Sequence, residues 1–127
     1  MYELTVSMEF QAAHQLRDYE GKCARLHGHN YRLEVAVASE ELNEQGLVMD
    51  FNDLKARMRR VLEAFDHQHL NEVEPFSSES GQNPTCENLA RVLYERLAEQ
   101  MSDPSVRVSR VRLWETASSA VTYSECG

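Results

Sequence analysis

The sequence has no long apolar run and few positive charges, and each lack excludes a class of function. The longest stretch without Asp, Glu, Lys or Arg extends only from Thr116 to Ser124, whereas a membrane-spanning helix needs about 20 apolar residues. The 13 basic residues are spread along the chain and stand against 21 acidic ones, a formal net charge of −8. This charge would repel a phosphate polymer, so we expect no nucleic acid as partner. Since no apolar run is long enough to span a bilayer, we expect no membrane as partner either.

Cysteine is also scarce. Cys23, Cys86 and Cys126 form an odd set at no regular spacing, and a chain of this length can bury a sufficient core without disulfides. No secretory signal pattern, internal repeat or linker is visible in the sequence. We therefore expect a single domain over residues 1–127 in the reducing environment of the cytoplasm.

Alternating apolar and polar residues predict two strands in the first third of the chain. Tyr2 to Phe10 alternates strictly, and residues 29–38 repeat the pattern. We expect these strands to pair antiparallel. Residues 15–26 between them show no apolar period, which predicts a long surface loop, and loops of this size are often functional.

The rest of the chain predicts two helices followed by two strands. Apolar residues at spacings of three and four indicate the helices, with Asp50 or Asn52 as one N-cap and Thr85 as the other. A bulge near Ser109 explains why the apolar positions of the third strand change from even to odd. The predicted elements are helices over 52–65 and 85–101 and strands over 106–115 and 120–125. This order predicts an α+β fold, a four-stranded antiparallel sheet with both helices on one face.

Three of the five histidines have the spacing of metal ligands. His27 and His29 lie two residues apart at the start of a strand, so their imidazoles point the same way. His14 follows the first strand on the parity of its apolar face, and the hairpin brings it to the other two. A lone His-x-His pair is as often a pair of polar residues at a surface turn as a pair of metal ligands. Three imidazoles without a fourth protein ligand, however, are typical of a catalytic zinc with one open position.

Cys23 lies four residues before His27, in a loop that also holds Arg17, Lys22 and Arg25. Neighbouring cations favour a thiolate. The spacing leaves two roles open for this residue: a fourth zinc ligand that closes a structural site, or a base or nucleophile beside an open one.

Two further positions carry ionisable side chains that suit catalysis. Asp66 and His67 follow the first helix and supply a carboxylate and an imidazole for proton transfer, although the helix dipole alone also favours a histidine there. Glu115 ends an otherwise apolar strand, where its carboxylate needs hydrogen bonds from protein or ligand. Arg112 is the alternative partner within the protein.

Six motifs, in order and covering nearly the whole chain, resemble the pterin-synthase family that includes 6-pyruvoyltetrahydropterin synthase and bacterial 6-carboxytetrahydropterin synthase. They are Phe10-Gln-Ala-Ala-His14, Cys23-Ala-Arg-Leu-His27-Gly-His29-Asn30-Tyr31, Val48-Met-Asp50-Phe51, Asp66-His67-Gln-His-Leu70-Asn71, Asn83-Pro-Thr85-Cys86-Glu87-Asn88 and Trp114-Glu115-Thr116. Each motif alone is weak evidence for the family, but six of them in this order and at suitable spacing are specific. The interval between Cys23 and His27 resembles the bacterial carboxy-forming branch.

The resemblance implies a role for each of these residues. It implies zinc (Zn2+) on the three histidines His14, His27 and His29, and Cys23 with the pair Asp66 and His67 as proton-transfer groups. It implies Glu115 as the acceptor that anchors the pterin ring, with Thr85 and Cys86 lining the pterin pocket. Cys86 departs from the small or hydroxyl residue expected there, so its contact is expected through the backbone.

The resemblance also implies the fold, the assembly and the reaction. Family members have the tunnelling fold (T-fold), in which sheets from three subunits form a barrel and two rings stack, so a homohexamer is implied. The implied reaction converts dihydroneopterin triphosphate and water to 6-carboxytetrahydropterin, acetaldehyde and triphosphate, in queuosine biosynthesis. Three alternatives stay open: a pyruvoyl-forming or folate-pathway enzyme of the same family, a non-catalytic zinc module with one cysteine and three histidine ligands, and a plain interaction domain.

Overall fold

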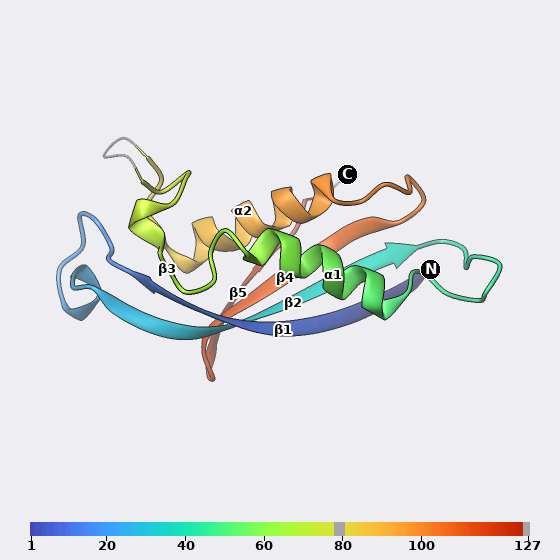
Figure 1. The fold of residues 1–127 in the computed structure, drawn as a ribbon. Coiled ribbons are helices and arrows are strands. Elements are labelled where there is room, and N and C mark those ends of the chain that lie inside the picture. The colour runs from blue at the N-terminus through green and yellow to red at the C-terminus, as the bar shows by residue number, and fades with distance from the viewer. Residues whose placement is uncertain (78–80, 126–127) are drawn as a thin grey trace.

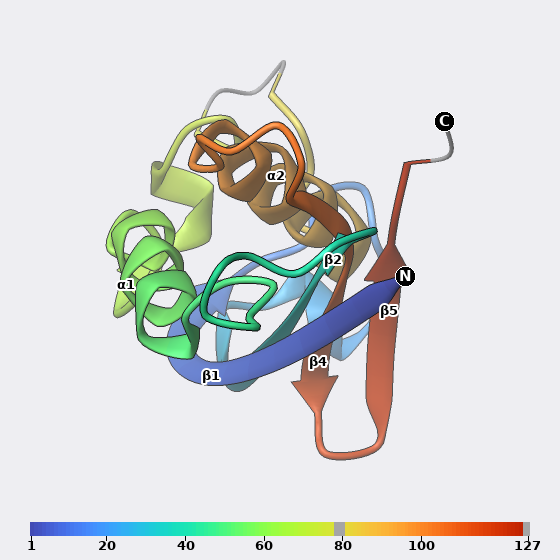
Figure 2. The same ribbon diagram turned by 90° about the vertical axis from the view of Figure 1, so that its right-hand side faces the viewer.

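Two helices cover one face of a long twisted sheet, and the other face carries no helix from the part of the chain that the structure describes (Figure 1, Figure 2). The protein is described from a computed structural model that covers residues 1–77 and 81–125, with all side chains in these ranges except that of Cys23. The arrangement confirms the predicted fold class, with both helices on the same side of the sheet. None of the helices in the described ranges combines the length and apolarity needed to cross a membrane.

The sheet has five strands rather than the four predicted. Its order is β3 (Gln68–His69), β1 (Tyr2–His14), β2 (His27–Ser39), β4 (Arg107–Thr116) and β5 (Ser119–Tyr123). All neighbours are antiparallel except β3, which pairs parallel to β1 at Ala12 and Ala13. The sheet is therefore mixed, and the added strand is too short to leave an alternating pattern in the sequence.

The first hairpin keeps an unbroken register from end to end. Tyr2 lies opposite Ser39 and His14 lies opposite His27, with one partner at every position between them. Even-numbered residues of β1, among them Val6, Phe10 and Ala12, face the core. The absence of a bulge in this hairpin confirms the parity count that brought His14 to the side of His27.

Two irregularities interrupt the pairing of β4. Arg110 pairs with Ala36 and Val108 with Val37, which leaves Ser109 as the extra residue, as the change of parity predicted. On the other side, Trp114 pairs with Ala120 and Thr116 with Ser119. Glu115 is thus the unpaired residue of a second irregularity, at the point where β4 approaches its turn.

Both helices begin at the predicted caps. The Asp50 carboxylate accepts from the Asn52 amide at 2.7 Å at the start of α1 (Phe51–Leu62), and the Thr85 hydroxyl accepts from Asn88 at 3.1 Å at the start of α2 (Cys86–Glu99). Their apolar stripes pack on the sheet and form the core with it. Two short 3-10 helices, η1 (Lys22–Ala24) and η2 (Leu70–Glu72), lie at the end of the sheet where β1 finishes and β2 begins.

Candidate metal centre and active site

Three histidines meet at the end of the first hairpin. His14 is the last residue of β1 and lies directly opposite His27, and His29 lies opposite the small side chain of Ala12. One ring nitrogen from each of the three falls within 4.8 Å of the others. The Nε2 atoms of His14 and His27 are 3.0 Å apart, close to the separation of about 3.3 Å expected between two imidazoles on one tetrahedral zinc.

Backbone carbonyls fix how two of these rings are protonated. His14 Nδ1 lies 2.7 Å from the carbonyl oxygen of Pro84, and His27 Nδ1 lies 2.7 Å from that of Arg25. Because a carbonyl only accepts, each Nδ1 carries the hydrogen, and in the neutral ring each Nε2 presents a lone pair. Two Nε2 atoms 3.0 Å apart can share either one proton or one metal ion, and carbonyls behind Nδ1 are the usual support of metal-binding histidines.

The third ring completes the donor set. Among the described residues, His29 Nε2 is buried and has no hydrogen-bond partner, and the Glu115 carboxylate lies 3.6 Å from it. A buried ring nitrogen without a partner indicates a missing ligand. Three imidazole nitrogens fit zinc, and they leave one position of a tetrahedral ion open.

Burial keeps the centre in the metal-binding form. Desolvation lowers the pKa of His14 and of His29 below the usual value of 6.5, and the charge of Glu115, with the Pro84 carbonyl at His14, offsets only part of that effect. Both rings therefore stay neutral over a wider pH range than exposed histidines. Since only neutral imidazole binds a metal, the site stays competent into mildly acidic solution.

Glu115 turns toward the metal centre and away from the arginine that offered an alternative partner. The Arg112 guanidinium donates from Nε to the Thr122 hydroxyl at 2.9 Å, and the Glu115 carboxylate faces His29. A groove of about 520 Å³ runs past His29 and Glu115, with Glu9 and Trp114 also on its wall. A half-buried carboxylate at such a place is available to a ligand that carries N–H donors.

Asp66 and His67 form the predicted pair. His67 Nδ1 lies 2.9 Å from Asp66 Oδ1 as an ion pair, and the same oxygen accepts from the backbone amide of Gln11 at 3.0 Å. The Gln11 amide is the main reason why the pKa of Asp66 lies below its usual value, and His67 adds to the effect. His67 lines a second groove, of about 460 Å³, together with His29 and His69.

Thr85 and Cys86 lie beside the centre, at the start of α2, directly after Pro84. The Thr85 hydroxyl caps the helix, and the Cys86 thiol donates to the Leu113 carbonyl at 3.5 Å. Burial raises the pKa of Cys86 to about 12, so it remains a thiol. The Cys86 thiol is occupied inside the protein, which leaves its backbone for any ligand contact, whereas the Thr85 hydroxyl still has an O–H to donate.

The side chain of Cys23 lies outside the described residues, so its role as an acid/base stays a prediction. Its backbone lies in η1, four residues before His27. Arg17, one of the three cations of this loop, donates to the carbonyls of Gln82 and Phe76. That guanidinium holds the loop in place.

Some residues near the centre stand in the quoted motifs, but the sequence assigned them no role. His69 has a buried Nε2 without a partner among the described residues and lies 3.5 Å from Glu72 through Nδ1. Its place depends on the pairing of β3 with β1, which spacing along the chain does not reveal. Asn71 and Asn83 bind the backbone after His14, again through contacts between distant segments.

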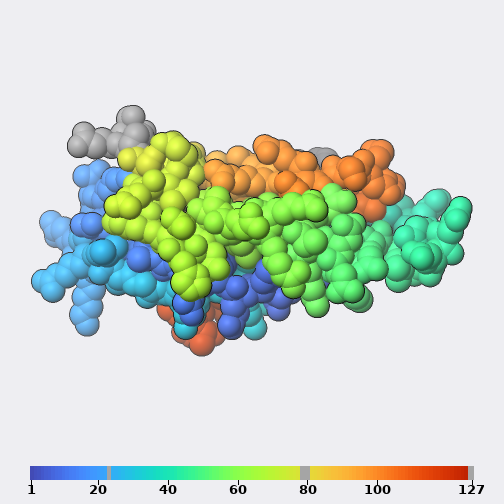
Figure 3. Space-filling view, viewed as in Figure 1, coloured from blue at the N-terminus to red at the C-terminus, as the bar shows by residue number. Residues whose placement is uncertain are grey.

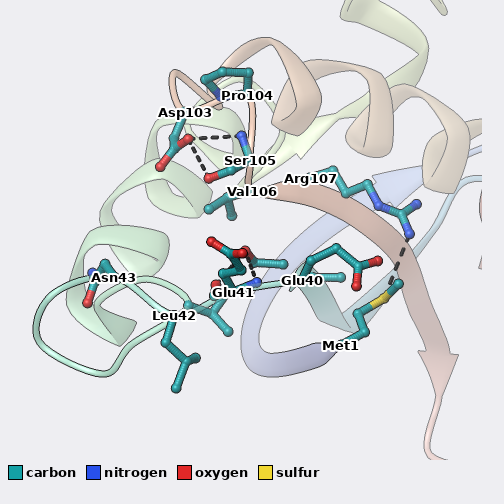
Figure 4. Close-up of a pocket in the computed structure, with 13 residues that line it drawn as sticks. Met1, Glu40, Glu41, Leu42, Asn43, Asp103, Pro104, Ser105, Val106 and Arg107 are labelled. Atoms are coloured by element: carbon teal, nitrogen blue, oxygen red, sulfur yellow. Dashed lines mark hydrogen bonds between the residues drawn. The ribbon is translucent and has the colours of Figure 1, made fainter.

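Another cavity, of about 550 Å³, lies at the opposite end of the sheet (Figure 4). It is lined by the start of β1, the end of β2 and the start of β4, and its side chains include Glu40, Glu41 and Asp103. The two ends of β1 are roughly 40 Å apart along the strand, with this cavity at one end and His14 at the other. This cavity is therefore separate from the metal centre.

Comparison with known proteins places the chain in a family. The family model for 6-pyruvoyl tetrahydropterin synthase matches residues 3–126. A 6-carboxy-5,6,7,8-tetrahydropterin synthase of Synechocystis sp. is 38% identical over 97% of this chain and 93% of its own length, and one of Haemophilus influenzae is 31% identical over 98% and 100%. The solved structure of Caenorhabditis elegans 6-pyruvoyl tetrahydropterin synthase superposes with a TM-score of 0.87 at 32% identity, covering 98% of this chain and 96% of that one. The protein therefore belongs to the 6-pyruvoyl tetrahydropterin synthase family.

Proposed function

We propose that this protein is a zinc-dependent 6-carboxytetrahydropterin synthase. Family membership makes it a tetrahydropterin synthase-type enzyme. The finer assignment is that it converts dihydroneopterin triphosphate and water to 6-carboxytetrahydropterin, acetaldehyde and triphosphate. The names of the two bacterial relatives and the short interval between Cys23 and His27 favour the carboxy-forming reaction over the pyruvoyl-forming one.

One observation carries the proposal: the convergence of His14, His27 and His29, with two Nδ1 atoms held by carbonyls and the third ring's Nε2 buried without a partner among the described residues. When bound there, zinc supplies a Lewis acid that stabilises negative charge developing on the substrate's side-chain oxygens. The chain's own residues supply the orientation of the three rings and a buried setting that excludes water on one side.

Proton transfer is assigned to two groups near the centre. His67 is held by Asp66 through Nδ1, which leaves its Nε2 free to take and return a proton. Cys23 is the second acid/base, because its loop brings cations that favour a thiolate. Together they move protons among the substrate's side-chain carbons and the ring carbon that bears them.

Glu115 is assigned to the pterin ring. Its carboxylate accepts hydrogen bonds from the ring's amino group and the adjacent N–H. Thr85 and Cys86 line the same end of the site, and their side chains already bind within the protein. The contact of Cys86 with the ring is therefore assigned to its backbone, and the Thr85 hydroxyl keeps an O–H to donate.

Product analysis tests the reaction directly. Incubation of the zinc-loaded protein with dihydroneopterin triphosphate is expected to release acetaldehyde together with a carboxypterin. A pyruvoyl product without acetaldehyde would assign the chain to the other branch, which the similarity to the Caenorhabditis elegans structure keeps as the second candidate.

Two variants separate metal binding from proton transfer. Cys23→Ala is expected to abolish turnover and keep its zinc, whereas His27→Ala is expected to lose both. Cobalt substitution adds a spectroscopic check, because an intense sulfur-to-metal charge-transfer band would place Cys23 in the coordination shell and favour the structural zinc module. Equal metal loss in the two variants would contradict the division of roles.

We also propose that the protein is cytoplasmic and forms a homohexamer, built as a dimer of trimers. Its proposed substrate is a small molecule, a pterin triphosphate. The cytoplasmic location follows from the odd number and irregular spacing of the cysteines. The assembly follows from the family resemblance and from the open edges of the sheet.

A further inference from the structure

The chain that leaves β1 after His14 is held by two carboxamide side chains. Asn71 Oδ1 accepts from the Gln15 amide at 2.8 Å, and Asn71 Nδ2 donates to the Gln15 carbonyl at 2.8 Å. Asn83 repeats this at Arg17, accepting at 2.9 Å and donating at 3.1 Å. Each asparagine thus offers the backbone both the acceptor and the donor that a neighbouring strand would offer. We name these two contacts the amide clamps.

The clamps join parts of the site that are distant in sequence. Asn71 lies in η2, shortly after Asp66 and His67, and the segment around residues 65–76 packs on the one that follows β1 (Figure 3). Asn83 precedes Pro84, whose carbonyl accepts from His14. The carbonyl of Asn83 also accepts from Asn88 Nδ2 at 2.9 Å, which ties the second clamp to α2.

Beyond the clamps, the loop is bound mainly to itself. Within the described residues, the hydrogen bonds of 18–26 are local: Ala24 donates to the Gly21 carbonyl at 3.2 Å, Arg25 donates to that of Lys22 at 3.1 Å, and the Arg25 carbonyl binds His27. The turn that contains Cys23 is therefore placed from two ends, by the clamp and the guanidinium contacts of Arg17 and by the start of β2.

We propose that Asn71 and Asn83 are positioning residues of this enzyme. By fixing the backbone of Gln15 and Arg17, they determine where the turn with Cys23 stands relative to the metal centre and to His67. The inference rests on the proposed function for the role of Cys23. The opposite view is that they only stabilise a loop, as Asn43 does at the far end of the sheet, where its side chain accepts from Gln45 and Leu47 at 2.9 and 3.0 Å.

Isosteric variants test the clamps. Asn71→Asp and Asn83→Asp keep the acceptor but set a carboxylate oxygen against a carbonyl where a donor stood. Misplacement by about 1 Å is sufficient to reduce turnover by roughly tenfold to a hundredfold, so we expect kcat to fall by that factor, with KM and zinc content near those of the native protein. Asn71→Ala and Asn83→Ala, which admit water instead of a charge, are the second pair if the Asp variants fold poorly. Asn43→Asp is the control for charge alone, because it adds a carboxylate at the far end of the sheet and keeps the acceptor that Gln45 and Leu47 use.

Two measurements on the zinc-loaded protein need no turnover: hydrogen exchange at the Gln15 and Arg17 amides, and the alkylation rate of Cys23 followed by mass spectrometry of its peptide. We expect faster exchange and a changed alkylation rate in the clamp variants and neither in Asn43→Asp. If the native protein lacks activity but these shifts appear, the proposed function fails and the clamps stand. Native exchange and alkylation in folded clamp variants, or effects equal to those of Asn43→Asp, would overturn the inference.

Discussion

At the scale of single residues, the function of the site depends on ring orientation as much as on residue type. The sequence shows that His14, His27 and His29 can meet, but it does not show which nitrogen of each ring faces the others. That is decided by the carbonyls of Pro84 and Arg25, and Pro84 is far from His14 along the chain. The orientation of Cys86 could not be predicted from its residue type either, because its thiol donates to the Leu113 carbonyl inside the protein.

Acid should destabilise the metal-free protein through two of these rings. Burial lowers the folded-state pKa of His14 and His29 below 6.5, so below that pH the unfolded chain binds more protons than the folded one. The contribution of these two rings to the free energy of unfolding is therefore fully present above about pH 6.5. It is lost as the pH falls through their lowered folded-state pKa values. Urea unfolding of the chelator-treated protein between pH 7.5 and 5 should show this fall, and His14→Gln should flatten it. A native-like slope in His14→Gln would contradict the assignment.

Glu115→Gln should weaken pterin binding and leave the metal in place. The change replaces a charge-assisted acceptor by a neutral amide, and a hydrogen bond to a charged group contributes about 1.5–3 kcal/mol, so a rise in Kd of roughly tenfold or more is expected. Fluorescence titration with a pterin measures it. Glu9→Gln is the control, since Glu9 lines the same groove, and an equal loss in both variants would mean that only the charge of the groove matters.

At the scale of the elements, local sequence patterns were sufficient to predict each long helix and strand. The alternation of β1, the apolar stripes and caps of both helices and the extra residue at Ser109 were all predicted and confirmed. β3 was missed because two residues carry no period and its parallel partner lies far away in sequence. The irregularity at Glu115 was missed because it depends on the pairing of β4 with β5.

We expect the N-cap of α2 to serve both stability and the proposed site, and that of α1 to serve stability alone. Removing the cap in Asp50→Ala or Thr85→Ala should lower the free energy of unfolding by about 1 kcal/mol in each case. Only Thr85→Ala should also weaken pterin binding, because Thr85 adjoins Pro84, which supports His14. Urea unfolding and ligand titration on the two variants give the comparison, and loss of binding in Asp50→Ala would show that the effect is global.

At the scale of the whole molecule, the sheet leaves both of its edges open. Within the described strands, β1 pairs on its outer side only at Ala12 and Ala13, and β5 pairs only with β4. Open edges favour pairing between chains, in line with the proposed ring of three subunits and a stack of two rings. Six chains of 14.6 kDa would give a particle of about 88 kDa.

Ionic strength should control this assembly. Each chain carries a formal charge of −8, so a hexamer carries 6 × −8 = −48, and like charges on neighbouring subunits repel across water. The Debye length shortens from about 30 Å at 0.01 M salt to about 8 Å at 0.15 M, which screens this repulsion while leaving backbone pairing between strands intact. Sedimentation velocity at fixed protein concentration should therefore show the particle of about 88 kDa gaining population as salt rises, with trimer or monomer favoured at low salt. A hexamer that dissociates on addition of salt would instead mean that ion pairs between subunits hold it together, and a chain that stays at 14.6 kDa in both buffers would rule the assembly out.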